Sequence, residues 1–135
     1  MSRVALLDPV LMDKLEQHQR ELVEKGRELA HNLGSDKERQ LRNILAIAEG
    51  SRSWALVELF MRYQAGRRQL NANWTEKAIS ELDGLKQLAR SIAPDKQPEI
   101  VAELHLELVK RVLGYAIWWY VWQSAAQSKD RRERS

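Results

Sequence analysis

The stretch WALVELFMRYQAGRR, at residues 54–68, joins an apolar helical segment to a closing pair of arginines. Its large apolar side chains fall on most sides of a helix instead of on a single face. Helices with this pattern are usually covered on all sides. The stretch therefore predicts a helix over residues 53–70 at the centre of a helical bundle.

The sequence before this stretch predicts two more helices. A start at Asp8-Pro9 and a continuous apolar stripe predict a first helix over residues 9–33, which the following glycine ends. The sequence SDKE at residues 35–38 matches a capping box, so a second and shorter helix is expected to begin there and to end by Gly50. The stripe of the first helix consists of Leu11, Leu15, His18, Leu22, Leu29 and Leu33.

The sequence after the stretch predicts two longer helices. A cap at Thr75 and regular apolar spacing predict a fourth helix that ends near Ile92. A loop bracketed by two prolines follows, and a fifth helix is expected over residues 99–127. The chain is therefore predicted to be all-α. It is expected to form a compact bundle of about five helices in a single domain, residues 1–128, with a basic, disordered tail at residues 129–135.

The composition is that of one globular domain. The chain has 135 residues, of which 30% are charged and 44% hydrophobic, so it can bury a core of its own. It has no cysteine, which excludes disulfides and thiol nucleophiles. Its first residues lack a long apolar signal core, and the apolar run that begins at residue 112 is too short to span a bilayer. We expect a cytoplasmic protein with no membrane partner.

Residue patterns that would support catalysis are missing from the sequence. Its three histidines lie on different predicted helices, and only Glu28 and His31 have the spacing of a di-iron motif, which needs a second such pair. No glycine-rich phosphate loop or nucleophile elbow occurs. The acidic stripe of Glu99, Glu103 and Glu107 is interpreted as a solvated helix face. We expect no enzymatic activity, no cofactor and no metal.

Arginine dominates the charge between residues 39 and 70, where six arginines meet two glutamates and no lysine. The planar guanidinium group donates paired hydrogen bonds that fit phosphate oxygens, so this cluster predicts RNA or DNA as a partner. An alternative stays open for part of the cluster. Glu58 lies four residues before Arg62, the spacing of an intrahelical ion pair, and the two arginines at residues 67 and 68 also complement a helix dipole.

Three segments of this sequence carry a family resemblance. They are LRNIL at residues 41–45, YQAGR at residues 63–67 and LVKRVLGYA at residues 108–116. In their order and in chain size, they make the protein resemble the small subunit of type III CRISPR effector complexes of the Csm kind. The resemblance covers residues 41–122, and the helix end YQAGR is its sharpest part.

The resemblance implies an all-helical, non-catalytic subunit that stacks in several copies along a ribonucleoprotein filament beside other effector-complex subunits. Its basic groove would contact the backbone of guide RNA and target RNA, leaving sequence recognition to base pairing. The sequence departs from the family at residues 117–120, where IWWY replaces an expected histidine and lysine, and in its long first helix. The candidate RNA-binding residues are Arg42, Arg62, Arg67 and Arg68, followed by Arg39 and Arg52.

Aromatic residues near the end of the last helix predict a subunit interface. Trp118, Trp119 and Trp122 point in different directions around one helix, and a terminal helix usually packs by one face, so part of this surface is expected to meet another subunit. A helix enclosed by the bundle is the alternative. Two other interpretations use the same surface: a helical protein-interaction adaptor with no nucleic-acid role, and a peripheral membrane protein.

Overall fold

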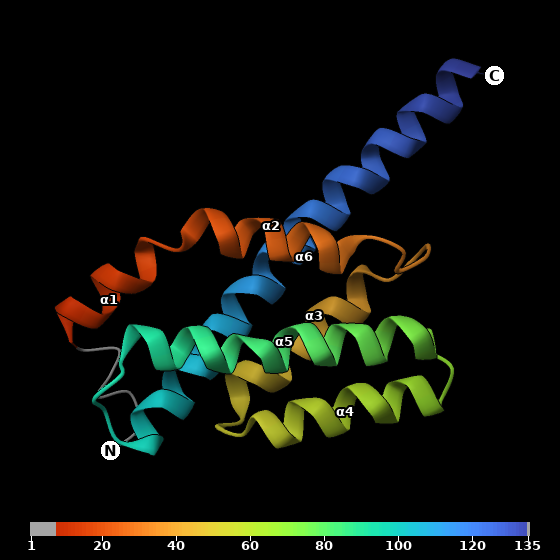
Figure 1. Cartoon of the computed structure of the whole chain (residues 1–135). Helices are drawn as coiled ribbons and strands as arrows, with labels where there is room; N and C mark the ends of the chain where they lie inside the picture. The colour runs from red at the N-terminus through yellow and green to blue at the C-terminus, as the bar shows by residue number, and fades with distance from the viewer. Residues whose placement is uncertain (1–7, 135) are drawn as a thin grey trace.

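The computed structural model describes residues 8–134, and this part of the chain is all-helical, as predicted (Figure 1). It contains six helices instead of about five. Their bounds are α1 Pro9–Glu16, α2 Gln19–Ala30, α3 Glu38–Gly50, α4 Trp54–Gly66, α5 Ala72–Ile92 and α6 Pro98–Arg134.

The sixth helix arises because the predicted first helix is interrupted after Glu16. The His18 N–H bonds to the carbonyl of Leu15, only three residues back, and the regular spacing resumes when the Leu22 N–H bonds to His18. The two halves have different neighbours, since α1 packs against α5 and α2 packs against α6. Tertiary packing thus interrupts a stripe whose local pattern is continuous.

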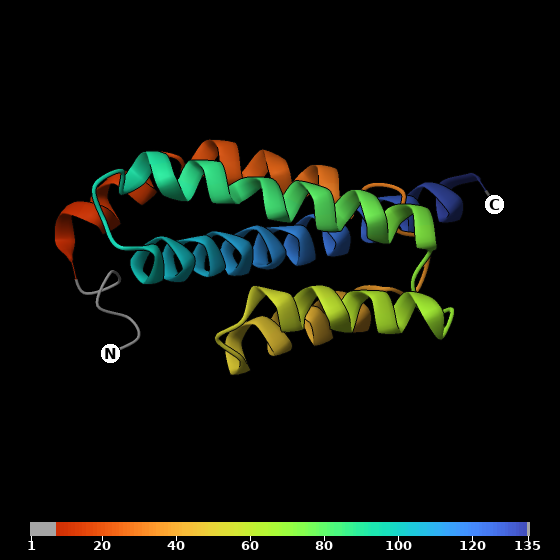
Figure 2. The same ribbon diagram turned by 60° about the horizontal axis from the view of Figure 1, so that its bottom comes forward.

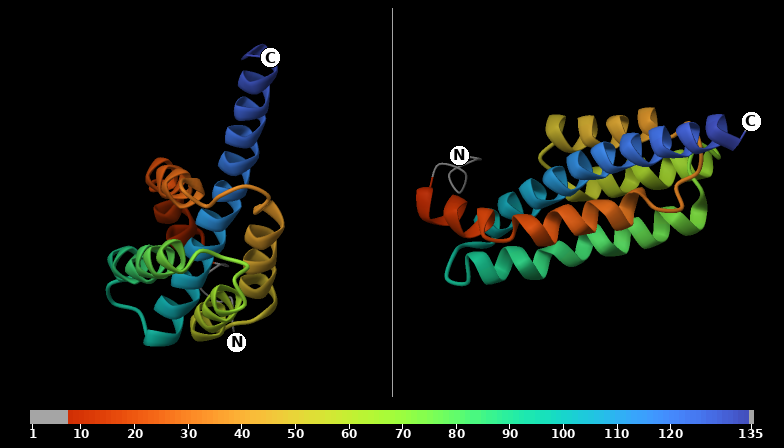
Figure 3. Two further views of the ribbon diagram at one scale, coloured as in Figure 1. Left: turned by 90° about the vertical axis from the view of Figure 1, so that its right-hand side faces the viewer. Right: turned by 90° about the horizontal axis from the view of Figure 1, so that it is seen from above.

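Helix α6 forms the axis of the bundle. Helices α2 and α5 cover one side of it, and α3 and α4 lie on the other side (Figure 2; Figure 3, left). The crossing of α2 over α6 is close at Gly26, where an added Cβ would lie 2.8 Å from the Tyr115 Cβ and 2.9 Å from the Ala116 nitrogen. The fully buried side chains of α6 include Leu104, Leu108, Val109 and Leu113.

The prediction that residues 53–70 form the central helix is wrong. Helix α4 lies at the edge of the bundle, packs against α3 and α5, and buries Val57, Met61 and Gln64. Leu59 and Tyr63 are 63% and 57% exposed. An all-round apolar pattern does not distinguish a covered helix from an edge helix with an apolar outer face, and α6 takes the central place.

Two predicted helix starts are also corrected. The capping box at residues 35–38 does not form, and α3 begins only at Glu38 because the N–H of Lys37 donates to the Tyr120 hydroxyl (2.9 Å). Asn71, not Thr75, caps α5, since its side chain accepts the N–H of Trp74 at 3.0 Å.

Helix α6 is longer than predicted. It runs past residue 127 to Arg134, and its last turns project beyond the other helices (Figure 1; Figure 3). Residues 129–134 of the predicted tail therefore continue α6 as helix. Residues 1–7 and Ser135 lie outside the described residues.

Candidate nucleic-acid interface

A polar cavity of about 350 Å³ lies between the start of α3 and the end of α4. We call it the arginine cavity, because Arg39 and Arg67 both line it. A single carboxylate, Asp36, is in its lining, and the other polar groups are amides and one lysine. The full lining is Asp36, Lys37, Arg39, Gln40, Asn43, Gln64, Arg67 and Gln69.

The YQAGR helix end holds Arg67 in place, and none of the described acidic side chains pairs with it. The Arg67 guanidinium lies over the Tyr63 ring, 5.4 Å from its centroid, and its Nη1 donates to the Gln64 Oε1 at 3.4 Å. Gln64 is itself buried and donates from Nε2 to the Gln40 Oε1 at 2.9 Å, which links α4 to α3. The charge of Arg67 is thus oriented but not neutralised, and a preorganised cation loses less entropy on binding an anion.

Further cations stand beside Arg67. Arg68 has a positive φ of 64° just after α4, and its side chain is exposed. Among the side chains that the structure describes, neither Arg39 nor Arg68 has an ion-pair partner. The Lys37 Nζ donates to the Gln69 carbonyl at 2.8 Å. This end of the bundle therefore presents an excess of positive charge to solvent.

Two of the predicted RNA-binding arginines are paired with carboxylates. Arg42 Nε lies 2.8 Å from the Glu38 carboxylate. Arg62 contacts Glu58 at 2.8 Å and Glu76 at 3.3 Å. The hydrogen bonds that Arg62 donates to Glu76 and, more weakly, to Glu58 raise the pKa of Arg62. Both arginines are therefore locally compensated.

The structure separates Arg52 from the other candidates. It precedes α4, whereas Arg67 and Arg68 follow it, so Arg52 lies at the opposite end of that helix. Arg39 and Arg67 are brought together in one cavity, with Arg68 next in the chain. The candidate arginines that no described carboxylate pairs with therefore lie at the two ends of α4: Arg39, Arg67 and Arg68 near its last turn, and Arg52 before its first turn.

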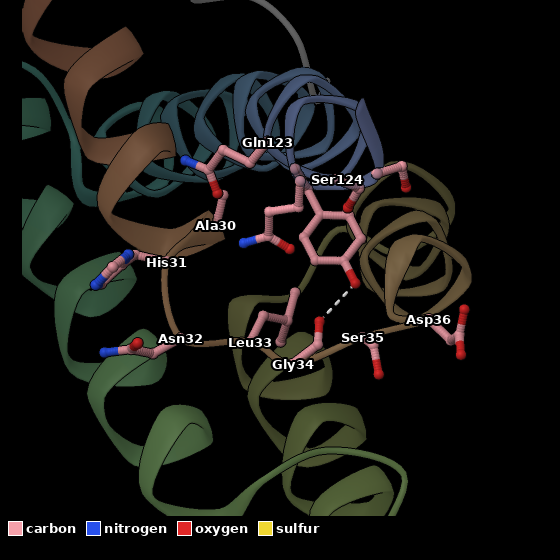
Figure 4. Close-up of a pocket in the computed structure, with 12 residues that line it drawn as sticks. Ala30, His31, Asn32, Leu33, Gly34, Ser35, Asp36, Gln123 and Ser124 are labelled. Atoms are coloured by element: carbon pink, nitrogen blue, oxygen red, sulfur yellow. Dashed lines mark hydrogen bonds between the residues drawn. The ribbon is translucent and has the colours of Figure 1, made fainter. Parts of the chain in front are cut away.

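A second polar cavity, of about 630 Å³, adjoins the arginine cavity across the loop between α2 and α3. Figure 4 shows Gln123 and Ser124 of α6 across from His31 and Asn32 at the end of α2. The Tyr120 hydroxyl fixes the loop by donating to the Gly34 carbonyl at 2.6 Å. We call this the amide cavity; its groups can hydrogen-bond to a base or a ribose. Its lining is Ala30, His31, Asn32, Leu33, Gly34, Ser35, Asp36, Tyr120, Gln123, Ser124, Gln127 and Ser128.

Sequence reasoning missed the amide cavity. Its groups come from the loop between α2 and α3 and from the far part of α6, about 90 residues later in the chain. Amides and hydroxyls in these places form no periodic motif. The one available signal was the polar run at residues 123–128, directly after the apolar part of α6.

The three predicted interface tryptophans differ in their surroundings. Trp118 is 74% exposed and Trp122 is 65% exposed, and the neighbouring Val121 is also exposed. Trp119 instead packs on α2, where its Nε1 donates to the Val23 carbonyl at 3.0 Å and Arg27 lies 5.5 Å from its ring centroid. Trp118 and Trp122 are therefore available to a partner, whereas Trp119 holds α6 against α2.

The acidic stripe is only partly solvated, contrary to the prediction. The Glu107 side chain is 17% exposed and contacts Lys110 and Arg111. Burial lowers the pKa of Arg111, but its hydrogen bonds with Glu16 and Glu107 outweigh this effect, and the net shift is upward. One oxygen of Glu103 is buried without a hydrogen-bond partner among the described residues. This network ties α1 to α6.

The described histidines and carboxylates do not converge. Where the structure describes the side chains, no group of three or more of these residues is placed to hold a metal ion. His105 is buried, with its Nε2 2.9 Å from the Leu82 carbonyl. In the same residues, every helix is too short or too polar to cross a membrane.

Comparisons with protein families, with curated proteins and with solved structures found nothing that matches this chain. The case for a function therefore rests on its own residues. Among the described residues, the best-defined feature is the oriented, uncompensated Arg67 beside Arg39 and Arg68.

Proposed function

We propose that this protein is a non-catalytic, RNA-binding small subunit of a type III CRISPR ribonucleoprotein effector complex, which contacts the backbone of guide RNA or target RNA. The observation that carries the proposal is Arg67, whose guanidinium is held by Tyr63 and Gln64 and has no carboxylate partner among the described side chains. The YQAGR segment that carries the family resemblance is the segment that builds this arrangement.

Backbone contact is the mode of binding that these residues favour. Arginines and amides around a shallow cavity suit phosphate oxygens, and such contacts provide affinity without sequence preference. The adjoining amide cavity adds hydrogen-bonding groups for a ribose or an unpaired base. We assign phosphate contacts to Arg39, Arg67 and Arg68, and give Arg42 and Arg62 a smaller part because carboxylates compensate them.

Assembly into a stack is supported by two unlike apolar surfaces. One consists of Trp118 and Trp122 on α6, and the other of Leu56, Leu59 and Tyr63 on α4. A contact between different surfaces of identical chains is heterologous, and repeated copies then form an open filament when the rotation does not close. These surfaces are available to neighbouring copies or to other subunits of the complex.

A helical adaptor is the second candidate function. Trp118 and Trp122 favour it, because exposed tryptophans are enriched in binding surfaces whether or not nucleic acid is present. In the adaptor, the arginines would be ordinary surface residues. Affinity for RNA that falls with salt separates the two functions, since the adaptor has none.

Binding to a short single-stranded RNA and to an RNA duplex, measured across a salt titration, tests the proposal. The double variant Arg67→Glu/Arg68→Glu should bind RNA more weakly and reduce the slope of log affinity against log salt by about 1 to 2. Arg20→Glu/Lys77→Glu is the matched control, because it makes the same change in net charge at two exposed residues on α2 and α5. Wild-type binding that is absent at low salt contradicts the proposal, as does an equal loss in the control.

A further inference from the structure

A larger cavity, of about 640 Å³, lies at the end of the bundle opposite the arginine cavity. The first turns of α4 and α6 and the last turn of α5 gather there (Figure 1). We call it the basic cavity. Its lining is Arg52, Trp54, Ala55, Lys86, Arg90, Ala93, Pro94, Lys96, Pro98, Val101, Ala102 and His105.

Positive charge in the basic cavity is largely uncompensated. Four cationic side chains line it, and the described lining contains no carboxylate. Lys86 pairs with Asp83 at 2.8 Å, just outside the lining. Arg52, Arg90 and Lys96 have no ion-pair partner in the described set of side chains. The N-termini of α4 and α6 add the positive ends of two helix dipoles.

One wall of the basic cavity is apolar and rigid. The Trp54 indole is fixed by its Nε1, which donates to the Asp83 Oδ1 at 2.9 Å, and by edge contact with His105 at 5.4 Å between ring centroids. Val101 and Ala102 continue the wall on α6. Burial lowers the pKa of His105, and Lys86 and Arg90 act in the same direction, whereas the Leu82 carbonyl and Asp83 oppose this shift without reversing it.

Charge and an aromatic wall in one cavity narrow the class of ligand. Several cations around one site suit a phosphate, and a fixed indole beside small apolar residues suits a flat ring. The volume falls within the range of about 300 to 1,000 Å³ of small-molecule sites. A simple carboxylic acid would leave the wall unused, and an apolar ligand would leave the cations without a partner.

We propose that the basic cavity binds a nucleoside 5′-phosphate, with the phosphate at Arg52, Arg90 and Lys96 and the base against Trp54. A free nucleotide and the 5′ end of an RNA present this same chemistry. The basic cavity shares no lining residue with the arginine cavity, so nucleotide binding can be tested separately from the proposed contacts to the RNA backbone.

Calorimetric titration of the full chain tests this site. The probes are AMP, UMP, inorganic phosphate, and one short RNA with either a 5′-phosphate or a 5′-hydroxyl. A free-nucleotide site binds AMP or UMP at least about tenfold more tightly than inorganic phosphate, because the base contacts the wall. An RNA-end site binds the 5′-phosphorylated RNA at least about tenfold more tightly than the 5′-hydroxyl RNA.

Charge reversal assigns the binding to the cavity. Arg52→Glu/Arg90→Glu changes two exposed side chains and should weaken binding at least about tenfold, with an unchanged circular dichroism spectrum. If that variant does not fold, the neutral Arg52→Gln/Arg90→Gln variant provides the same comparison. Arg20→Glu/Lys77→Glu, which makes the same change in net charge at two exposed residues outside the cavity, is the matched control and should change affinity less than about twofold.

Three results would overturn the site. The first is that no nucleotide and no 5′-phosphorylated RNA binds. The second is that AMP and inorganic phosphate bind equally tightly and a 5′-phosphate does not change the affinity for RNA, and the third is that the charge-reversed chain binds as tightly as wild type. Arg67→Glu/Arg68→Glu keeps its nucleotide binding if the two sites are separate. If wild-type RNA binding is absent while nucleotide binding is present, only the backbone proposal fails. If nucleotide binding is absent while Arg67→Glu/Arg68→Glu still weakens RNA binding, only the basic cavity fails.

Discussion

Replacing Trp118 and Trp119 one at a time by alanine should have opposite consequences, although the residues are adjacent. Trp118 is 74% exposed, and its described ring contact is with Tyr115 at 6.3 Å between centroids. Trp119 is half-buried, donates to the Val23 carbonyl and lies under Arg27. The first change should alter assembly, and the second should alter folding.

The expected cost of Trp119→Ala follows from these contacts. A fully buried tryptophan costs about 3 to 5 kcal/mol when truncated to alanine, and half-burial reduces that figure by roughly half. The lost hydrogen bond adds about 1 kcal/mol and the contact with Arg27 about 0.5 kcal/mol. Trp119→Ala should therefore lower the free energy of unfolding by about 3 kcal/mol, and Trp118→Ala by less than about 0.5 kcal/mol.

Urea unfolding followed by circular dichroism measures these costs, and sedimentation of the same samples measures self-association. Trp118→Ala should keep its unfolding midpoint and lose self-association. Trp119→Phe, which keeps a ring but loses the N–H, should fall between wild type and Trp119→Ala. Equal destabilisation by the two alanine variants would refute the assignment of Trp118 to the surface and of Trp119 to the contact with α2.

Three further predictions concern the bundle itself. Gly26→Ala should lower the free energy of unfolding by about 1 to 3 kcal/mol in urea melts, because the added methyl group meets the α6 backbone. Gly84→Ala, in open space on α5, should raise it by about 0.5 to 1 kcal/mol. A change of the same sign in both variants would contradict the close crossing of α2 and α6. Tyr120→Phe should cost about 1 to 3 kcal/mol by the same assay, since its hydroxyl bonds both the Gly34 carbonyl and a backbone N–H, and an unchanged midpoint would rule those bonds out as stabilising. Because burial lowers the pKa of His105, the unfolded chain binds its proton more readily, so stability should fall as pH drops below about 6.5. His105→Gln should flatten that fall in urea melts between about pH 5 and pH 8, and an unchanged slope would assign it to other groups.

The all-helical class was predictable because apolar spacing and turn residues repeat along the whole chain. The place of each helix in the bundle was not. The helix at residues 54–66 and the part of the last helix at residues 112–122 both carry apolar side chains on most sides, yet the last helix is central and the first is peripheral. Periodicity describes one helix at a time, whereas the central position depends on which helices compete for it.

Helix ends were harder to predict because distant side chains decide them. A capping box at residues 35–38 is locally plausible. The Tyr120 hydroxyl, more than 80 residues away, instead accepts a hydrogen bond from the Lys37 N–H and donates one to the Gly34 carbonyl, which holds the loop in another conformation. The interruption near His18 likewise reflects two different packing partners. No local motif records such contacts.

The cluster of arginines was predictable from the sequence, but which of these arginines pair with carboxylates was not. The arginine-only segment is visible in the sequence, and so is the spacing that pairs Glu58 with Arg62. The second carboxylate on Arg62, from Glu76, comes from the next helix. The support of Arg67 by Gln64 and Gln40 also crosses between helices. Which arginines stay free is therefore a property of the fold.

The salt dependence of RNA binding by two charge-reversed chains tests the central claim most directly. Arg67→Glu/Arg68→Glu removes two arginines that have no ion pair among the described side chains, and Arg42→Glu/Arg62→Glu removes two paired ones with the same change in net charge. We predict that the first variant reduces the slope of log affinity against log salt by about 1 to 2, and that the second changes it by less than about 0.5. Equal reductions in both variants, or none in either, would contradict RNA binding through the arginine cavity.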